Sequence, residues 1–317
     1  MRWHMGDNIN SKKNFFQRIV MPISKLEVYY KWQRKERFES GVAIAGTKLR
    51  KRLHGVMIFC LAIDRILTGR KITIIGNQFK KSESPVIYAC THVGRYDIET
   101  ALEKLVPEQA YFLMGDPGTV YKSFEGILLY MNGTVFVDTA DKEDRYIGKE
   151  TCIQLLEQGA NILIYPEGAW NVSENQVVMP LFTGTAEMAI RTGAQIVPIA
   201  IEQYGKHYYA NIGENIQCDG MEWSQIQELT VHLRDVLCTL KWDIWEQFKP
   251  VSRSSLPSDA AEQFLEGIMC QTENGYTLDE IHRTRFHTKE EIEQKDVYNH
   301  LDKLIPCSRN AFLFRKR

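Results

Sequence analysis

The chain has no apolar run long enough to cross a membrane as a helix. Spanning a bilayer takes roughly 20 consecutive apolar residues. The best candidate, Gly55–Leu67, has 13 residues and includes Asp64 and Arg65. The first twenty residues also lack the continuous apolar core and the small-residue cleavage site of a secretory signal. We therefore expect a chain that neither traverses a membrane nor enters the secretory route.

Cysteines are few and poorly spaced for a structural role. The seven cysteines are odd in number and form no C-x-x-C pair, which argues against a disulfide framework and a zinc site and favours a reducing, cytosolic compartment. Internal repeats, heptad runs and low-complexity tracts are also missing. The 317 residues are 44% hydrophobic and 25% charged, a globular composition that excludes a disordered or fibrous protein.

The net charge of −1 hides a strong asymmetry. Residues 1–53 hold 13 Lys and Arg against 4 Asp and Glu, whereas the remaining residues hold 26 against 36. A basic arm on an acidic body suits nucleic acid or an anionic membrane. Apolar and aromatic residues interleave with the cations in Asn14–Phe38, as in an amphipathic helix at the headgroup boundary. We expect residues 1–55 to form a membrane-associating arm without nucleic-acid binding; the alternative is a helix packed on its own domain.

The middle of the chain alternates strand-like and helical segments, which predicts an α/β fold with a mixed, largely parallel sheet flanked by helices. The expected strands are Ile72–Gly76, Pro85–Cys90, Ala110–Met114, Thr134–Asp138, Asn161–Tyr165 and Gln195–Ile201. The expected helices are Asp97–Val106, Lys142–Gln158, Gly184–Arg191 and Trp223–Phe248. Residues 56–240 would form this domain. Residues 241–317, with a Ser/Pro linker at Pro250–Pro257, would be an extension whose role the sequence does not reveal.

A histidine and an aspartate stand together where one strand meets a helix. His92 follows the strand that ends at Cys90, and Asp97 lies five residues further on. Asp97 is placed to hydrogen-bond one ring nitrogen, leaving the other to accept a proton as a general base. The alternative role of Asp97 is a helix N-cap. A protein nucleophile would have to be Cys90 or Ser123, although Cys90 is better explained as a small core residue.

Three later segments turn this pair into a recognisable pattern. They are Gly133-Thr-Val-Phe-Val-Asp138, Tyr165-Pro-Glu-Gly168 and Ile196-Val-Pro-Ile199. In this order and at these spacings, they and the His-X4-Asp segment resemble blocks one to four of the glycerolipid acyltransferases, the family that includes 1-acylglycerol-3-phosphate acyltransferase. The resemblance covers Ile72–Ile201 and includes Gly184.

The resemblance implies a reaction and a site. His92 would be the catalytic base, with Asp97 orienting it, and the acceptor hydroxyl would attack the thioester of acyl-CoA or acyl carrier protein without an acyl-enzyme. No cofactor or metal is implied. Glu167, Gly168 and Gly133 would shape the acceptor site. Backbone N–H groups near Gly94 or Gly168 are candidates for stabilising the oxyanion.

The sequence departs from the family where polar groups normally line the site. Thr91 and Gly94 replace the usual Asn and Ser, Thr139 replaces an Arg, Ala169-Trp170 replaces Thr-Arg, and Phe112–Asp116 lacks a lysine. The missing Arg and Lys would normally hold the acceptor's phosphate. Either Arg95, Lys122 and Arg145 supply the charge, or the acceptor carries no phosphate there. Trp170 suits the second explanation, because an indole can stack on a sugar or line an acyl tunnel.

We therefore expect a lipid O-acyltransferase of phospholipid biosynthesis at the cytoplasmic face of a membrane, peripheral or monotopic, with a lysophospholipid such as 1-acylglycerol-3-phosphate as acceptor. The alternatives are a glycolipid or aminolipid acceptor, a thioesterase, and a lipid-binding protein that has lost catalysis.

Overall fold

The computed structural model describes residues 12–13, 15–41, 47–81, 83–115, 122, 126, 128–129, 132–173, 176–249, 251, 255–270, 277–287 and 308. Its centre is a seven-stranded sheet with the order β1-β7-β6-β2-β5-β3-β4. The strands are β1 (Lys71–Asn77), β2 (Val86–Cys90), β3 (Ala110–Gly115), β4 (Thr134–Val137), β5 (Asn161–Ile164), β6 (Gln195–Tyr204) and β7 (His207–Ile212).

The sheet is largely parallel, as predicted. Strands β6, β2, β5, β3 and β4 run in the same direction. The exception is the junction of β6 and β7, which is antiparallel, and β1 then pairs with β7 in parallel. All six predicted strands are present. The carboxyl ends of β2, β5 and β6 consequently meet at one edge of the sheet, where α/β proteins place their ligands.

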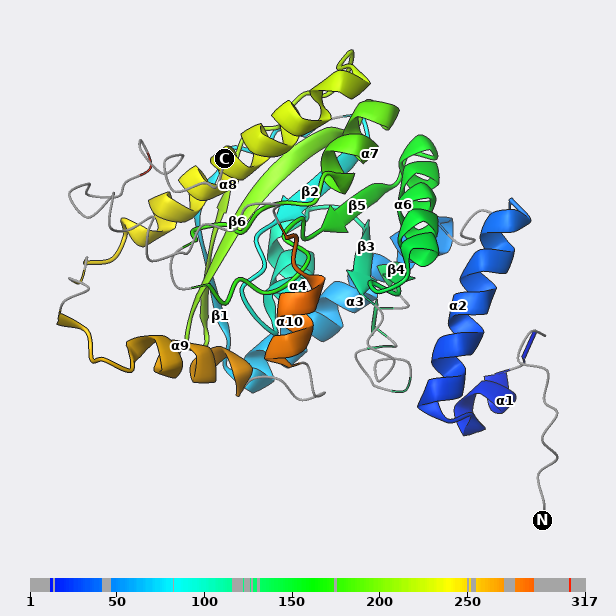
Figure 1. The fold of residues 1–317 in the computed structure, drawn as a ribbon, viewed down its shortest axis with the longest axis horizontal. Coiled ribbons are helices and arrows are strands. Elements are labelled where there is room, and N and C mark those ends of the chain that lie inside the picture. The colour runs from blue at the N-terminus through cyan, green and yellow to red at the C-terminus, as the bar shows by residue number, and fades with distance from the viewer. Residues whose placement is uncertain are drawn as a thin grey trace.

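Helices cover both faces of the sheet (Figure 1). One face packs against α6 (Lys142–Glu157), α7 (Gly184–Thr192) and α8 (Ile226–Trp245). The other face packs against α3 (Thr47–Thr68), α4 (Asp97–Thr100) and the π-helical turn η1 (Ala101–Leu105). Side chains of β2 alternate between the two cores, with Ile87 and Ala89 on the first and Tyr88 and Cys90 on the second. A strand that is buried on both faces holds the residues that follow it rigidly in place.

Strand β7 was not predicted from the sequence. It follows β6 through a tight turn in which Gly205 adopts a left-handed φ of 58°, a conformation that glycine reaches without steric cost. Its sequence, His-Tyr-Tyr-Ala-Asn-Ile, breaks the β-branched pattern of the other strands. The hairpin places β7 and β1 beside the predicted parallel core.

The N-terminal arm folds as two helices, and the prediction of one helix over Asn14–Phe38 is wrong. Helix α1 (Phe15–Val20) ends before Pro22, and α2 (Ile23–Glu39) begins after it. Proline disfavours helical conformation in the residue before it, which explains the break.

The basic side chains of α2 face the acidic start of α6. Lys31 pairs with Asp138 and Asp141, and Arg34 pairs with the buried Asp144. Lys35 pairs with Glu143. Part of the arm's positive charge is therefore used within the protein, as expected of a helix packed on its own domain.

Helix α3 passes through residue 55 without interruption, so the predicted boundary at 55/56 falls inside a helix. Met57 and Leu61 pack beneath the sheet. In the part of the chain that the structure describes, no helix combines the length and the apolar character needed to span a bilayer.

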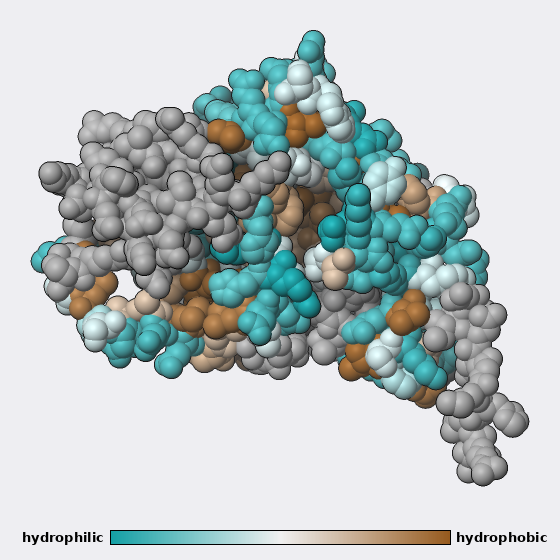
Figure 2. All heavy atoms as spheres, viewed as in Figure 1, coloured by the Kyte–Doolittle hydropathy of each residue, from teal (hydrophilic) through white to brown (hydrophobic). Residues whose placement is uncertain are grey.

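Two helices of the C-terminal extension, α9 (Ala260–Met269) and α10 (Leu278–Thr284), lie along the carboxyl edge of the sheet (Figure 1). The same view with atoms as spheres shows a hollow with apolar residues inside it (Figure 2).

Candidate active site

His92 and Asp97 form a hydrogen-bonded dyad at the end of β2. The Nδ1 atom of His92 lies 2.8 Å from Oδ2 of Asp97. Asp97 is fully buried, whereas the His92 side chain keeps 15% of its surface exposed. A proton on Nδ1 that is shared with the carboxylate leaves Nε2 unprotonated and ready to accept a proton. The dyad therefore has the geometry of a general base and its orienting group.

Asp97 also organises the loop that carries His92. Its Oδ2 atom accepts hydrogen bonds from the backbone N–H groups of Val93, at 2.7 Å, and Gly94, at 3.1 Å. The structure records no side-chain cap at the start of α4, so Asp97 bonds the preceding loop and not its own helix. This arrangement argues against the N-cap alternative and fixes the imidazole relative to the strand end.

Glu167 holds the same loop from the neighbouring strand. It follows β5 and is fully buried. Its two carboxylate oxygens accept from the backbone N–H groups of His92, at 2.9 Å, and Met179, at 2.8 Å. Burial raises the pKa of Glu167, and nearby Lys241 and the two amide donors oppose that rise. Glu167 therefore positions His92, and its burial argues against the prediction that it touches the acceptor.

Replacing Glu167 by alanine is expected to destabilise the fold by roughly 2–5 kcal/mol, because two buried N–H groups lose their acceptor. Glu167→Gln should lose less, since its amide keeps one acceptor oxygen. Urea denaturation measures both effects. The matched control is Glu150→Ala, which removes a partly exposed carboxylate paired with Arg191 and should cost under about 1 kcal/mol. Equal effects at Glu167 and Glu150 would contradict the positioning role.

Two aromatic rings frame His92. The Tyr165 ring lies 4.3 Å from the imidazole between centroids, and the Trp170 ring meets it edge-on at 6.2 Å. The backbone N–H of Asn171 donates to the His92 carbonyl at 2.8 Å. Trp170 was predicted as a site residue, whereas Tyr165 and Asn171 were not. Their positions close to the Pro-Glu-Gly segment could have indicated that they lie in the site.

The C-terminal extension packs against Trp170 and so supports the site, a role that the sequence did not reveal. Trp170 packs in one cluster with Ile281 of α10 and Ile268 of α9. The backbone of α10 also approaches Gly168: a Cβ added there would lie 2.4 Å from the Phe182 ring and 3.2 Å from the Thr284 carbonyl. Gly168 has a φ of 76°, so the turn requires glycine for both its conformation and its packing.

The suggested protein nucleophiles gain no support. Cys90 is fully buried, and burial raises the pKa of its thiol well above the ordinary value, with a further contribution from Asp97. A thiol held protonated in the core is a poor nucleophile. Ser123 lies outside the described residues.

The structure places two predicted substrate-binding residues away from the dyad. Arg145 is exposed on α6 and donates to the Thr139 carbonyl beyond β4, three strands from β2 and thus roughly 14 Å away. Gly133 precedes β4, where an added Cβ would lie 2.7 Å from the Tyr111 ring. These positions argue against acceptor binding by either residue: Gly133 serves packing, and Arg145 binds the backbone.

The other two candidate cations, Arg95 and Lys122, also contact groups of the protein. Arg95 is close to the dyad in the sequence. Its guanidinium carbon lies 4.7 Å from the centroid of the Tyr96 ring, a cation–π contact. Lys122 donates to the Met21 carbonyl at 2.6 Å. Neither contact forms part of a phosphate clamp.

Two departures from the family pattern prove structural. Thr91 is fully buried, and its hydroxyl exchanges hydrogen bonds with the backbone of Ile201 in β6. Gly94 leaves room for Gln203, because an added Cβ would lie 2.8 Å from its Oε1 atom. The two backbone N–H groups suggested as donors to the oxyanion already have acceptors in the protein. The Gly94 N–H donates to Asp97, and the Gly168 N–H donates to the Tyr165 carbonyl.

The fold and the site together define a three-layer α/β protein with a buried His–Asp dyad at the carboxyl edge of parallel strands. Residues 71–202 match the family model described as Acyltransferase. Over these residues, the match confirms the resemblance seen in the sequence.

Similar proteins carry related names. The chain is 26% identical over 161 residues to a 1-acyl-sn-glycerol-3-phosphate acyltransferase of Borreliella burgdorferi, covering 50% of this chain and 61% of that one. A chloroplastic protein of the same name from Brassica napus is 26% identical over 160 residues, covering 50% and 45%. The chain thus spans about half the length of these relatives.

A solved structure shows the same fold. The crystal structure of the 1-acyl-sn-glycerophosphate acyltransferase PlsC from Thermotoga maritima aligns with a TM-score of 0.51 and 16% identity, covering 73% of this chain and 95% of that one.

Proposed function

We propose that the chain is an O-acyltransferase that moves a fatty acyl group from acyl-CoA or acyl carrier protein to the hydroxyl of a lysolipid. The observation that carries the proposal is the dyad, because a buried carboxylate that fixes one ring nitrogen of a partly exposed histidine is what activation of a hydroxyl requires. The names of the relatives make 1-acylglycerol-3-phosphate the first acceptor to test.

The residues of the chain account for the two transfers of one proton, first to His92 and then from it. His92 Nε2 accepts the proton of the acceptor hydroxyl as its oxygen attacks the thioester carbonyl carbon. A new C–O bond forms, the C–S bond breaks, and the proton passes from His92 to the departing thiolate. Asp97 stabilises the transient imidazolium, and Glu167 keeps the His92 backbone in place.

Product analysis tests the proposal. Purified full-length protein is mixed with acyl-CoA or acyl-carrier-protein donors and lysophosphatidate, and the lipids are identified by mass spectrometry. The expected product is a diacyl lipid from at least one donor. Free fatty acid formed equally with and without an acceptor would indicate a thioesterase, and tight liposome binding without turnover would indicate a lipid-binding protein.

We further propose that the enzyme lies peripherally on the cytoplasmic face of a membrane and contacts it through α3. Five apolar side chains of α3 recur at helical spacing and are exposed: Val56, Phe59, Ile63, Ile66 and Leu67. Exposed Lys48, Lys51 and Arg52 precede them on the same helix. A helix that combines apolar and basic residues in this way fits an anionic lipid surface.

The double variant Phe59→Asp/Ile66→Asp should weaken binding to anionic liposomes at least about ten-fold, because two apolar contacts are replaced by charges that the lipid repels. Sedimentation with liposomes measures the partition. The matched control, Trp223→Asp, alters an equally exposed apolar residue before α8 and should leave binding unchanged. Unaltered binding of the α3 variant would refute this membrane contact.

A further inference from the structure

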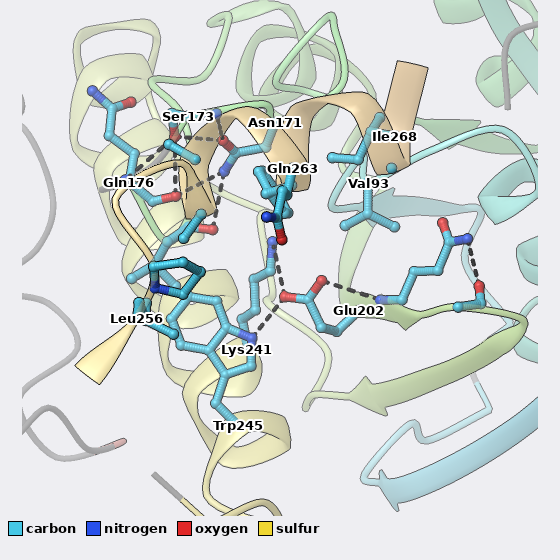
Figure 3. A pocket seen from close by; sticks show the side chains of 18 of the residues that line it. Val93, Asn171, Ser173, Gln176, Glu202, Lys241, Trp245, Leu256, Gln263 and Ile268 are labelled. Atoms are coloured by element: carbon cyan, nitrogen blue, oxygen red, sulfur yellow. Dashed lines mark hydrogen bonds and ion pairs between the residues drawn. The ribbon is translucent and has the colours of Figure 1, made fainter. Parts of the chain in front are cut away.

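A cavity of about 660 Å³ adjoins the catalytic loop (Figure 3). It lies between the end of β6, helix α8, helix α9 and the segment that follows Trp170. Val93, the residue after His92, and Asn171, which bonds the His92 carbonyl, both line it. Neither dyad residue is in the lining, so a ligand in this cavity would lie beside the loop that carries His92, and the volume suits a small-molecule group.

The polar lining consists mainly of amides and hydroxyls. The contributing residues are Asn171, Ser173, Gln176, Gln203, Ser258 and Gln263. A carboxamide both donates and accepts hydrogen bonds, as does a sugar or polyol hydroxyl. Figure 3 shows Gln263 of α9 pointing toward Lys241 from across the cavity. Within the protein, Asn171 and Ser173 bond each other and nearby carbonyls, and Gln203 and Gln263 donate to Gly205 and Asp259. Neutral hydroxyls of a ligand would extend this network, since carboxamides and hydroxyls can form more than one hydrogen bond.

The charges in the described lining cancel. Lys241 is its single cation and Glu202 its single anion, and their side chains approach to 3.6 Å. The same Glu202 oxygen accepts from the Trp245 indole N–H at 2.6 Å, which fixes the carboxylate in the cavity wall. A phosphate dianion would have to compete with Glu202 for Lys241 and would meet a carboxylate of the same sign.

Among the described residues, the three cations proposed from the sequence make other contacts. Arg145 and Lys122 bond backbone carbonyls at other places, and the Arg95 guanidinium lies over the Tyr96 ring. Thr139 and Trp170 stand where the acyltransferase pattern has arginine, and Trp170 packs against α9 and α10.

We propose that this cavity holds the headgroup of the acceptor, and that the headgroup is a phosphate-free polyhydroxyl group such as a hexose of a glycolipid. The inference rests on the proposed acyl transfer, since the hydroxyl to be acylated is the one that lies beside His92. The C-terminal helix α9 supplies one wall of the cavity and so determines acceptor specificity.

The test compares kcat/KM for three acceptors with the same acyl chain: a hexosyl monoacylglycerol, monoacylglycerol and lysophosphatidate. The wild-type protein should favour the hexosyl lipid over lysophosphatidate at least about ten-fold. Gly267 lines the cavity, and a Cβ added there meets no atom within 4 Å. Gly267→Leu should therefore fill the cavity without strain and lower the ratio of hexosyl lipid to monoacylglycerol kcat/KM about ten-fold. Glu266→Leu, which adds leucine to α9 outside the lining, should leave that ratio unchanged.

Preference for lysophosphatidate, with a ratio that Gly267→Leu does not alter, would overturn the headgroup assignment and leave acyl transfer intact. If no acceptor is acylated, the proposed function fails. Binding then decides the cavity's role: tryptophan fluorescence of the His92→Ala protein with hexosyl monoacylglycerol in micelles should show binding that Gly267→Leu weakens. Absence of such binding would reject the inference as well.

Discussion

Replacing His92 by alanine is expected to lower kcat for acyl transfer by about 10³-fold, within the range that a positioned general base contributes. The acceptor hydroxyl then loses the group that removes its proton as it attacks the thioester. The fold should persist, because the loop is held by backbone bonds to Asp97 and Glu167 that do not use the imidazole. Steady-state transfer and circular dichroism measure the two effects.

The matched control is Cys90→Ala, which alters a buried residue two positions away in the same strand end. It should keep kcat within a few-fold. A Cys90→Ala protein as inactive as His92→Ala, with its fold intact, would instead indicate a thiol nucleophile.

Changing Asp97 to asparagine should also lower kcat, by about 10³ to 10⁴-fold. An amide that presents its NH₂ group to Nδ1 favours the opposite tautomer, which places the ring proton on Nε2 and removes the base. The same NH₂ group would face the backbone N–H groups of Val93 and Gly94, because all three bonds meet at the Oδ2 position, so a loss of stability should accompany the loss of kcat. Comparison of kcat with the urea midpoint separates the chemical effect from the structural one.

Asp144→Asn provides the matched control for loss of a buried carboxylate. Asp144 accepts from Arg34 and from the Asp138 backbone beside the edge strand β4, three strands from β2. Its replacement should reduce stability and leave kcat nearly unchanged. Equal losses of kcat in the two variants would mean that Asp97 acts through the fold alone.

The parallel core was predictable because its strands are buried on both faces. Runs such as Val86–Cys90 and the Ile-Leu-Ile of β5 are apolar throughout, so composition alone marks them as strands. Strand β7 was not predicted because tyrosine and asparagine interrupt the run of β-branched residues. The partners of α2 were also hidden, since its cations are neutralised by acidic residues more than 100 positions away.

The candidate site was only partly readable from the sequence. The spacing of His92 and Asp97 predicts their contact because a strand end and a short loop keep five residues close. The positioning role of Glu167 could not be predicted from the sequence, because its partner Met179 lies twelve residues away and its full burial follows only from the fold. The role of the C-terminal extension could not be predicted either, because Ile281 contacts Trp170 only in the folded chain.

The central claim is that His92 activates the acceptor hydroxyl for direct attack on the thioester. Its most direct test is a rapid-quench experiment in which protein and acyl donor are mixed first without acceptor, and intact protein mass is recorded before and after the acceptor is added. The account predicts an unmodified protein mass and formation of acylated lipid only after acceptor addition. An acylated protein that forms and decays as fast as turnover would contradict it.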